Sequence, residues 1–157
     1  MHIHKVIIGL FALSLSCIPN FPVTATEVSE QEKCISETKA VAQKLVENRN
    51  IKLRLDVINL SEYEEDYPVN RPLAFHFSFE GWATADIMNS PQFLTIATTR
   101  IIRSCPNVAQ VSFGEYATDW STIIGLMHDG NIRHFKCYDP SELTTSSKLK
   151  WGETICL

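Results

Sequence analysis

Apolar residues recur every three or four positions in two stretches of the chain, and this period predicts two amphipathic helices. The first covers residues 26–50 and opens with Ser29 and Glu32 at the spacing of a capping box. Its expected buried stripe consists of Ile35, Thr38, Val41, Ala42 and Leu45. The second helix covers residues 90–105, with Pro91 at the first position, where a missing backbone N–H costs no hydrogen bond.

Apolar and polar residues alternate in other segments, which is the period of a strand with one buried face. The alternation is clear in residues 51–60, and it recurs in residues 73–79, where Leu73, Phe75, Phe77 and Phe79 share one face. Three further strands are predicted at residues 108–113, 120–127 and 132–138. The last two flank residues 128–131, whose Asp-Gly pair favours a tight hairpin turn.

The predicted elements follow one another in the order α-β-β-α-β-β-β, which indicates a single α+β domain over residues 26–157. Because strands joined by short turns pair antiparallel, we expect one mostly antiparallel sheet. Both helices are expected to pack on one face of this sheet. The opposite face would then be exposed and available for binding.

The first 25 residues have the parts of a signal peptide for export. Lys5 gives a basic start, residues 6–18 form an apolar run, and small residues favour cleavage after Ala25. The run is shorter than the ~20 residues of a membrane-spanning helix, and no later segment is apolar enough to span a bilayer. An alternative is a lipid anchor at Cys17, because the residues before it loosely resemble a bacterial acylation motif. Either route predicts a secreted or periplasmic protein.

Four cysteines remain after cleavage, and an even number in an exported chain predicts two disulfides. Cys34 lies near the start of the first helix and Cys105 ends the second, so antiparallel helices would bring them together. Cys137 ends the last strand and Cys156 lies in the C-terminal tail, which suggests a second bridge. The alternative pairing, Cys105–Cys137 with Cys34–Cys156, stays open. No cysteine pair has the short spacing of a zinc knuckle, so neither a metal nor another cofactor is expected.

The charge of the domain narrows the range of partners. Once Lys5 is removed with the signal, 13 basic and 18 acidic residues give a net charge near −5. The basic residues do not cluster, which argues against nucleic acid and against anionic membrane surfaces as partners. The remaining candidates are a protein, a small molecule or a carbohydrate.

Four residues are candidates for a binding surface, namely His76, Trp82, Trp120 and His134. His76 alternates with phenylalanines, so it points to the opposite face of its strand, and His134 would share that face if the two strands were neighbours. Trp82 and Trp120 lie beside strand ends, where an exposed ring suits contact with a carbohydrate or a protein. The alternative for each tryptophan is a place in the core. A metal site at the two histidines lacks an identifiable third ligand.

The last third of the chain contains a series of short motifs. They are Phe113-Gly114, Thr118-Asp119-Trp120, Gly125-Leu126, Phe135-Lys136-Cys137 and the closing run from Trp151 to Leu157. In these residues the chain resembles small exported bacterial proteins, mainly cyanobacterial, that have no assigned function. The resemblance implies export and a bacterial host, and it implies no chemistry.

The sequence therefore favours a non-enzymatic binding or accessory domain outside the cytoplasm. One alternative is a small secreted hydrolase in which His76 or His134 works with Asp119 or Asp129 as a general base. Another alternative is an inhibitor of a secreted enzyme, with the polar loop over residues 139–150 as its contact segment.

Overall fold

The computed structural model describes residues 25–142 and 149–156. The predicted signal peptide lies outside the described residues except for Ala25, and so does the alternative lipid anchor at Cys17. Half of the loop expected over residues 139–150, residues 143–148, also lies outside them. Within the described residues, no helix is both long and apolar enough to cross a membrane.

Helices and strands both contribute to the fold, which confirms the predicted α+β class. The helices are α1 (Ala25–Val46), α2 (Thr84–Met88) and α3 (Pro91–Ser104), with short 3-10 turns η1 (Leu60–Glu62) and η2 (Pro140–Glu142). The strands are β1 (Lys52–Asn59), β2 (Leu73–Glu80), β3 (Val108–Glu115), β4 (Ser121–Leu126), β5 (Ile132–His134), β6 (Lys136–Tyr138) and β7 (Glu153–Ile155). Helix α2 and strand β7 were not predicted from the sequence.

Five strands form the central sheet in the order β1-β2-β3-β4-β5, and β6 and β7 form a separate pair. Strands β2 and β3 run parallel, whereas the other three neighbouring pairs of the central sheet are antiparallel. The sheet is therefore mixed: three of its four strand pairs are antiparallel, in line with the mostly antiparallel sheet that was expected, and the β2–β3 pair is the exception. The cause is the connection from β2 to β3, which passes through α2 and α3 and returns the chain to the same end of the sheet.

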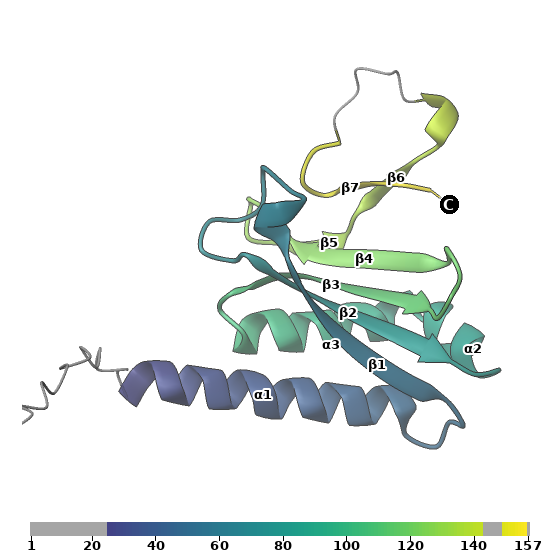
Figure 1. The fold of residues 1–157 in the computed structure, drawn as a ribbon, viewed down its shortest axis with the longest axis horizontal. Helices are drawn as coiled ribbons and strands as arrows, with labels where there is room; N and C mark the ends of the chain where they lie inside the picture. The colour runs from purple at the N-terminus through teal and green to yellow at the C-terminus, as the bar shows by residue number, and fades with distance from the viewer. Residues whose placement is uncertain (1–24, 143–148, 157) are drawn as a thin grey trace, which may run out of the picture.

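The main core lies between the central sheet and α1 and α3, which run antiparallel beneath one face of it (Figure 1). Phe77 of β2 and Phe113 of β3 are register partners, and their rings stack with centroids 5.6 Å apart. Leu45 of α1 and Ile101 of α3 are fully buried against them. The large side chains that are fully buried are Phe77, Phe79, Phe113, Leu45, Ile87, Leu94, Ile101, Ile102, Ile124, Val41, Val108 and Val111.

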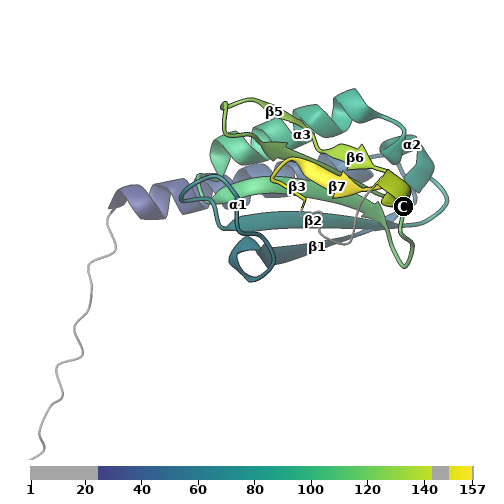
Figure 2. The same cartoon turned by 90° about the horizontal axis from the view of Figure 1, so that it is seen from above.

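A second, smaller apolar cluster lies on the other side of the sheet, where β6 and β7 cover part of it (Figure 2). Trp151 is buried in this cluster, and its indole N–H donates a 2.8 Å hydrogen bond to the carbonyl oxygen of Leu126. Phe135 packs edge-on against Trp151 and covers Gly125 of β4, where any Cβ would lie 2.6 Å from the Phe135 ring. Phe135 thus separates β5 from β6, and the predicted strand 132–138 is two short strands.

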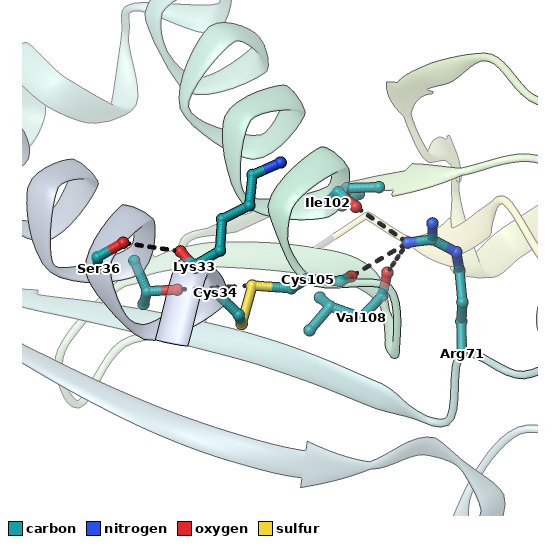
Figure 3. The surroundings of a disulfide bond; sticks show 8 residues. Lys33, Cys34, Ser36, Arg71, Ile102, Cys105 and Val108 are labelled. Atoms are coloured by element: carbon teal, nitrogen blue, oxygen red, sulfur yellow. Dashed lines mark hydrogen bonds between the residues drawn. A yellow bond between two sulfur atoms is a disulfide. The ribbon is translucent and has the colours of Figure 1, made fainter. Parts of the chain in front are cut away.

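The two disulfides are Cys34–Cys105 and Cys137–Cys156, as the predicted layout favoured, and the alternative pairing is wrong. The first joins α1 to the end of α3, with Cα atoms 4.6 Å apart (Figure 3). Beside it, the Arg71 guanidinium donates hydrogen bonds to the carbonyl oxygens of Ile102, Cys105 and Val108. The second disulfide holds β6 to the C-terminal tail. Disulfides are typical of proteins in oxidising compartments, and both bridges are compatible with one.

Candidate functional site

The face of the central sheet opposite α1 and α3 is polar across its first three strands. Asp56 of β1, His76 of β2 and Ser112 of β3 are cross-strand neighbours in one row. The adjacent row contains Arg54, Ser78 and Gly114. Side chains alternate between faces along a strand, so these residues share the face that the buried phenylalanines do not use.

His76 lies at the centre of this arrangement. Its Nδ1 lies 2.8 Å from Ser112 Oγ, so the imidazole and the hydroxyl share a hydrogen bond. Burial lowers the pKa of His76, and the nearby charge of Asp56 opposes that shift by raising it. The net result favours a neutral imidazole, which has one ring nitrogen as a donor and the other as an acceptor.

Gly114 allows His76 and the neighbouring strand β4 to approach each other closely. A Cβ at position 114 would lie 3.3 Å from His76 Cε1 and 3.5 Å from the Ser121 Cβ. Ser121 is the register partner of Gly114, so it lies on the same polar face. Because position 114 has no side chain, His76 and Ser121 approach each other over the buried Gly114.

Ser121 also lines a narrow cleft between β4 and the β6–β7 pair. The cleft has a volume of about 130 Å³. It is lined by Asp119, Ser121, Thr122, Ile123, Phe135, Cys137, Thr154, Ile155 and Cys156. One wall thus contains the Cys137–Cys156 disulfide, which fixes β6 and the tail relative to each other. Hydroxyl-bearing residues of two strands, Ser121 of β4 and Thr154 of β7, line this space, and such residues suit a ligand that forms hydrogen bonds.

An aromatic side chain and a group of charges border the polar residues at the end of the sheet. The Arg54 guanidinium lies over the Tyr116 ring, 3.9 Å from its centroid, and the tyrosine side chain remains 44% exposed. Glu80 accepts hydrogen bonds from Lys52 at 3.0 Å and from Arg54 at 3.5 Å. These contacts lower the pKa of Glu80, chiefly through the Lys52 hydrogen bond, so its carboxylate stays charged.

We use the name polar face for the set of residues that these contacts connect. It consists of Arg54, Asp56, His76, Ser78, Glu80, Ser112, Gly114, Tyr116 and Ser121. It provides donors, acceptors, charges of both signs and one partly exposed ring on a rigid sheet. Ser78 and Ser112 are both 7% exposed, so a ligand would contact mainly the larger side chains around them.

The two candidate tryptophans lie at one end of the sheet. Trp82 follows β2 and is 85% exposed, whereas Trp120 precedes β4 and is 39% exposed. The carboxyl ends of β2 and β3 and the start of β4 meet at this end (Figure 1). Both tryptophans are therefore accessible to solvent at this end of the sheet, whereas Trp151 is in the core.

His134 lies on the other face of the sheet from His76. Its register partner Ile124 belongs to the main core, on the side of the helices. Its ring nitrogens lie 3.2 Å from Thr122 Oγ1 and 3.2 Å from Thr95 Oγ1, the latter on α3. The shared surface proposed for the two histidines is thus not present, because β3 and β4 lie between their strands and their side chains face opposite ways.

The acidic neighbours of the histidines also differ from the sequence-based pairs. Asp56 is the carboxylate beside His76, and neither Asp119 nor Asp129 takes this role. Asp129 instead contacts Arg133 at 3.2 Å. The contacts of His134 described above are with threonine hydroxyls. A general base formed by His134 with Asp119 or Asp129 therefore lacks geometric support.

His76 is the one residue of the polar face that was a candidate from the sequence, and the other eight were missed: Arg54, Asp56, Ser78, Glu80, Ser112, Gly114, Tyr116 and Ser121. Alternation in residues 51–60 and 73–79 already placed Asp56 and His76 on the polar sides of their strands. What the pattern lacked was the register that sets them opposite each other. The parallel pairing of β2 with β3, which places Ser112 beside His76, depends on the helical crossover.

Within residues 25–142 and 149–156, no group of three or more His, Cys, Asp and Glu side chains is arranged to hold a metal ion. Comparison of the chain with protein-family models, with curated proteins and with solved structures finds no match.

Proposed function

We propose that this protein is an exported, non-enzymatic binding domain that holds a hydrogen-bonding ligand on its polar face. Export is supported by the signal-like first 25 residues and by two disulfides, which persist in oxidising compartments. The resemblance of the last third of the chain to exported bacterial proteins favours a periplasmic or extracellular site.

The observation that carries the binding proposal is the row of Asp56, His76 and Ser112 on one face of the sheet, with Ser121 of β4 close to His76. Binding sites for polar ligands place a few donors and acceptors on rigid elements beside an aromatic ring. Here the sheet holds the polar groups, and Arg54 holds the Tyr116 ring at the border. A carbohydrate fits this chemistry, because hydroxyls pair with His and carboxylate groups while a sugar ring packs on an aromatic face. Trp82 and Trp120 would extend the contact surface at the end of the sheet.

An array of immobilised oligosaccharides, including β-1,4-linked glucose and N-acetylglucosamine series, tests this proposal. We expect saturable binding to at least one series, with a loss of affinity of tenfold or more in Asp56→Asn and in Tyr116→Ala. The matched controls are Asp86→Asn on α2 and Ile96→Ala on α3, both exposed on other elements. Absence of binding to every series, or equal losses in the control variants, would contradict the proposal.

A second candidate function is ester or amide hydrolysis, since Asp56, His76 and Ser112 are the residue types of a serine hydrolase triad in one row. Against it, Ser112 is only 7% exposed, so a substrate carbonyl reaches its hydroxyl poorly. Hydrolysis of p-nitrophenyl esters that disappears in Ser112→Ala and persists in Ser78→Ala would favour catalysis. Equal rates in the wild type and Ser112→Ala would exclude it.

A further inference from the structure

Strand β1 is an edge of the central sheet, and its outer side pairs with no strand among the described residues. It is eight residues long and pairs with β2 in continuous register, without a bulge or a proline. Long, regular edge strands readily pair with another strand, and proteins usually protect them by short length, bulges, prolines or inward charges. β1 is long and has no bulge, proline or inward charge; its charged residues Lys52, Arg54 and Asp56 all lie on the polar side of the strand.

The two sides of β1 differ in chemistry. Arg54 and Asp56 lie on the polar face, whereas Leu53, Leu55 and Val57 lie on the side of the helices. Leu55 is 41% exposed and Val57 is 60% exposed, although both are large apolar residues on the core side of the sheet. Val57 borders a groove of about 620 Å³ against α1, in which the 46% exposed Ile35 also takes part.

We propose that two copies of this chain pair through β1, antiparallel, about a two-fold axis at Leu55. In this register Arg54 of each copy lies opposite Asp56 of the other, and these two pairs of opposite charge lie on the polar face. On the helix side Leu55 meets its own copy and Leu53 lies opposite Val57. Opposite charges and apolar pairs in directly facing positions both stabilise neighbouring strands.

The charge pattern of β1 selects this register among the antiparallel alternatives. An axis at Leu53 would set Lys52 opposite Arg54, and an axis at Arg54 would set that arginine opposite its own copy. An axis at Asp56 would bring two carboxylates together, and one at Val57 would pair neither Arg54 nor Asp56 with an opposite charge. Like charges in facing positions are destabilising. An axis between two residues would put apolar side chains opposite polar ones.

Pairing in this way joins the two central sheets into one, with both polar faces on the same side. The four helices α1 and α3 of the two copies then lie together on the other side, beside the covered apolar residues. The arrangement is isologous, so it closes after two copies and does not extend into a fibre.

Sedimentation velocity of the purified, disulfide-bonded protein, combined with single cysteines in β1, tests the proposal. We expect a species of twice the monomer mass at micromolar concentration. The Leu55→Cys variant should form a covalent dimer under mild oxidation, because position 55 faces its own copy. In Val57→Cys the two thiols would be offset by four residues, about 13 Å along the strand, which is beyond disulfide reach. An equal mixture of Leu53→Cys and Val57→Cys should again cross-link.

Charge exchange gives an independent test of the register. Arg54→Asp and Asp56→Arg should each weaken the dimer tenfold or more, and the double exchange should restore it. Far-UV circular dichroism checks that every variant is folded. A monomer at all concentrations, equal cross-linking in Leu55→Cys and Val57→Cys, or a dimer indifferent to the charge changes would overturn the proposal. Pairing of β1 with a different protein would give the first of these results.

Discussion

Removing the Cys34–Cys105 disulfide should destabilise the protein more than removing Cys137–Cys156. The first bridge closes a loop with a sequence separation of 71 residues, and the second closes one of 19 residues. In the chain-entropy model these loops correspond to about 4 and about 3 kcal/mol of stabilisation, a difference of about 1 kcal/mol. Burial adds to the difference, because Cys105 is fully buried in the main core.

Urea unfolding of the double variants Cys34→Ala/Cys105→Ala and Cys137→Ala/Cys156→Ala measures this difference directly. Each variant keeps the other disulfide, and circular dichroism and tryptophan fluorescence should give coincident transitions. We expect the first variant to have the lower free energy of unfolding by 1 kcal/mol or more (order of magnitude, from the same loop-length model). An equal or larger loss of unfolding free energy in the second variant would contradict the predicted order, since loop length and burial both favour a larger loss in the first.

Three further predictions concern single residues. Arg71→Ala should lower the free energy of unfolding by about 2–3 kcal/mol in urea, because three carbonyl oxygens lose a charged donor, and exposed Arg103→Ala should cost far less. Burial lowers the pKa of folded His76, so the unfolded chain binds a proton first, and stability should fall as pH drops below about 6.5. His76→Gln should flatten this part of the pH profile, and an unchanged profile would contradict it. Gly125→Ala should cost about 1–3 kcal/mol, because its Cβ would lie 2.6 Å from the Phe135 ring, and Phe135→Leu should recover part of the loss.

Local pattern predicted the elements that have a regular period. The stripe in residues 26–50 corresponds to α1, although the helix ends at Val46, four residues before the predicted end. The proline that opens α3 is at its first position, as its fixed φ angle favours. The disulfide pairs also followed from the layout, because α1 and α3 run antiparallel and bring Cys34 to Cys105.

The order and direction of the strands in the sheet could not be predicted from the local sequence pattern. Alternation gives the faces of a strand but not its neighbours, and the connection from β2 to β3 determines that the two strands run parallel. Phe135 continues the alternation of residues 132–138, yet its packing on Trp151 and over Gly125 ends β5 and starts β6. Such contacts between distant residues leave no local signal.

In the candidate site, too, the local pattern predicts the face of a residue but not its neighbours on other strands. His76 was singled out because it is a polar residue among phenylalanines, and its placement opposite them is what the alternation predicts. Its partners Asp56 and Ser112 come from neighbouring strands whose register the sequence does not state. His134 follows the same alternation rule on β5, but its register with Ile124 of β4 puts it on the helix side.

Native mass spectrometry of the protein purified from the envelope or medium of its own host tests export, both disulfides and ligand binding in one experiment. We expect the mass of residues 26–157 less four hydrogens, together with the additional mass of a bound ligand. This ligand mass should be absent from the Asp56→Asn/Tyr116→Ala variant purified in parallel. A full-length, fully reduced mass would contradict export and both disulfides. A ligand retained equally by the wild type and the variant would contradict the polar face as its binding site.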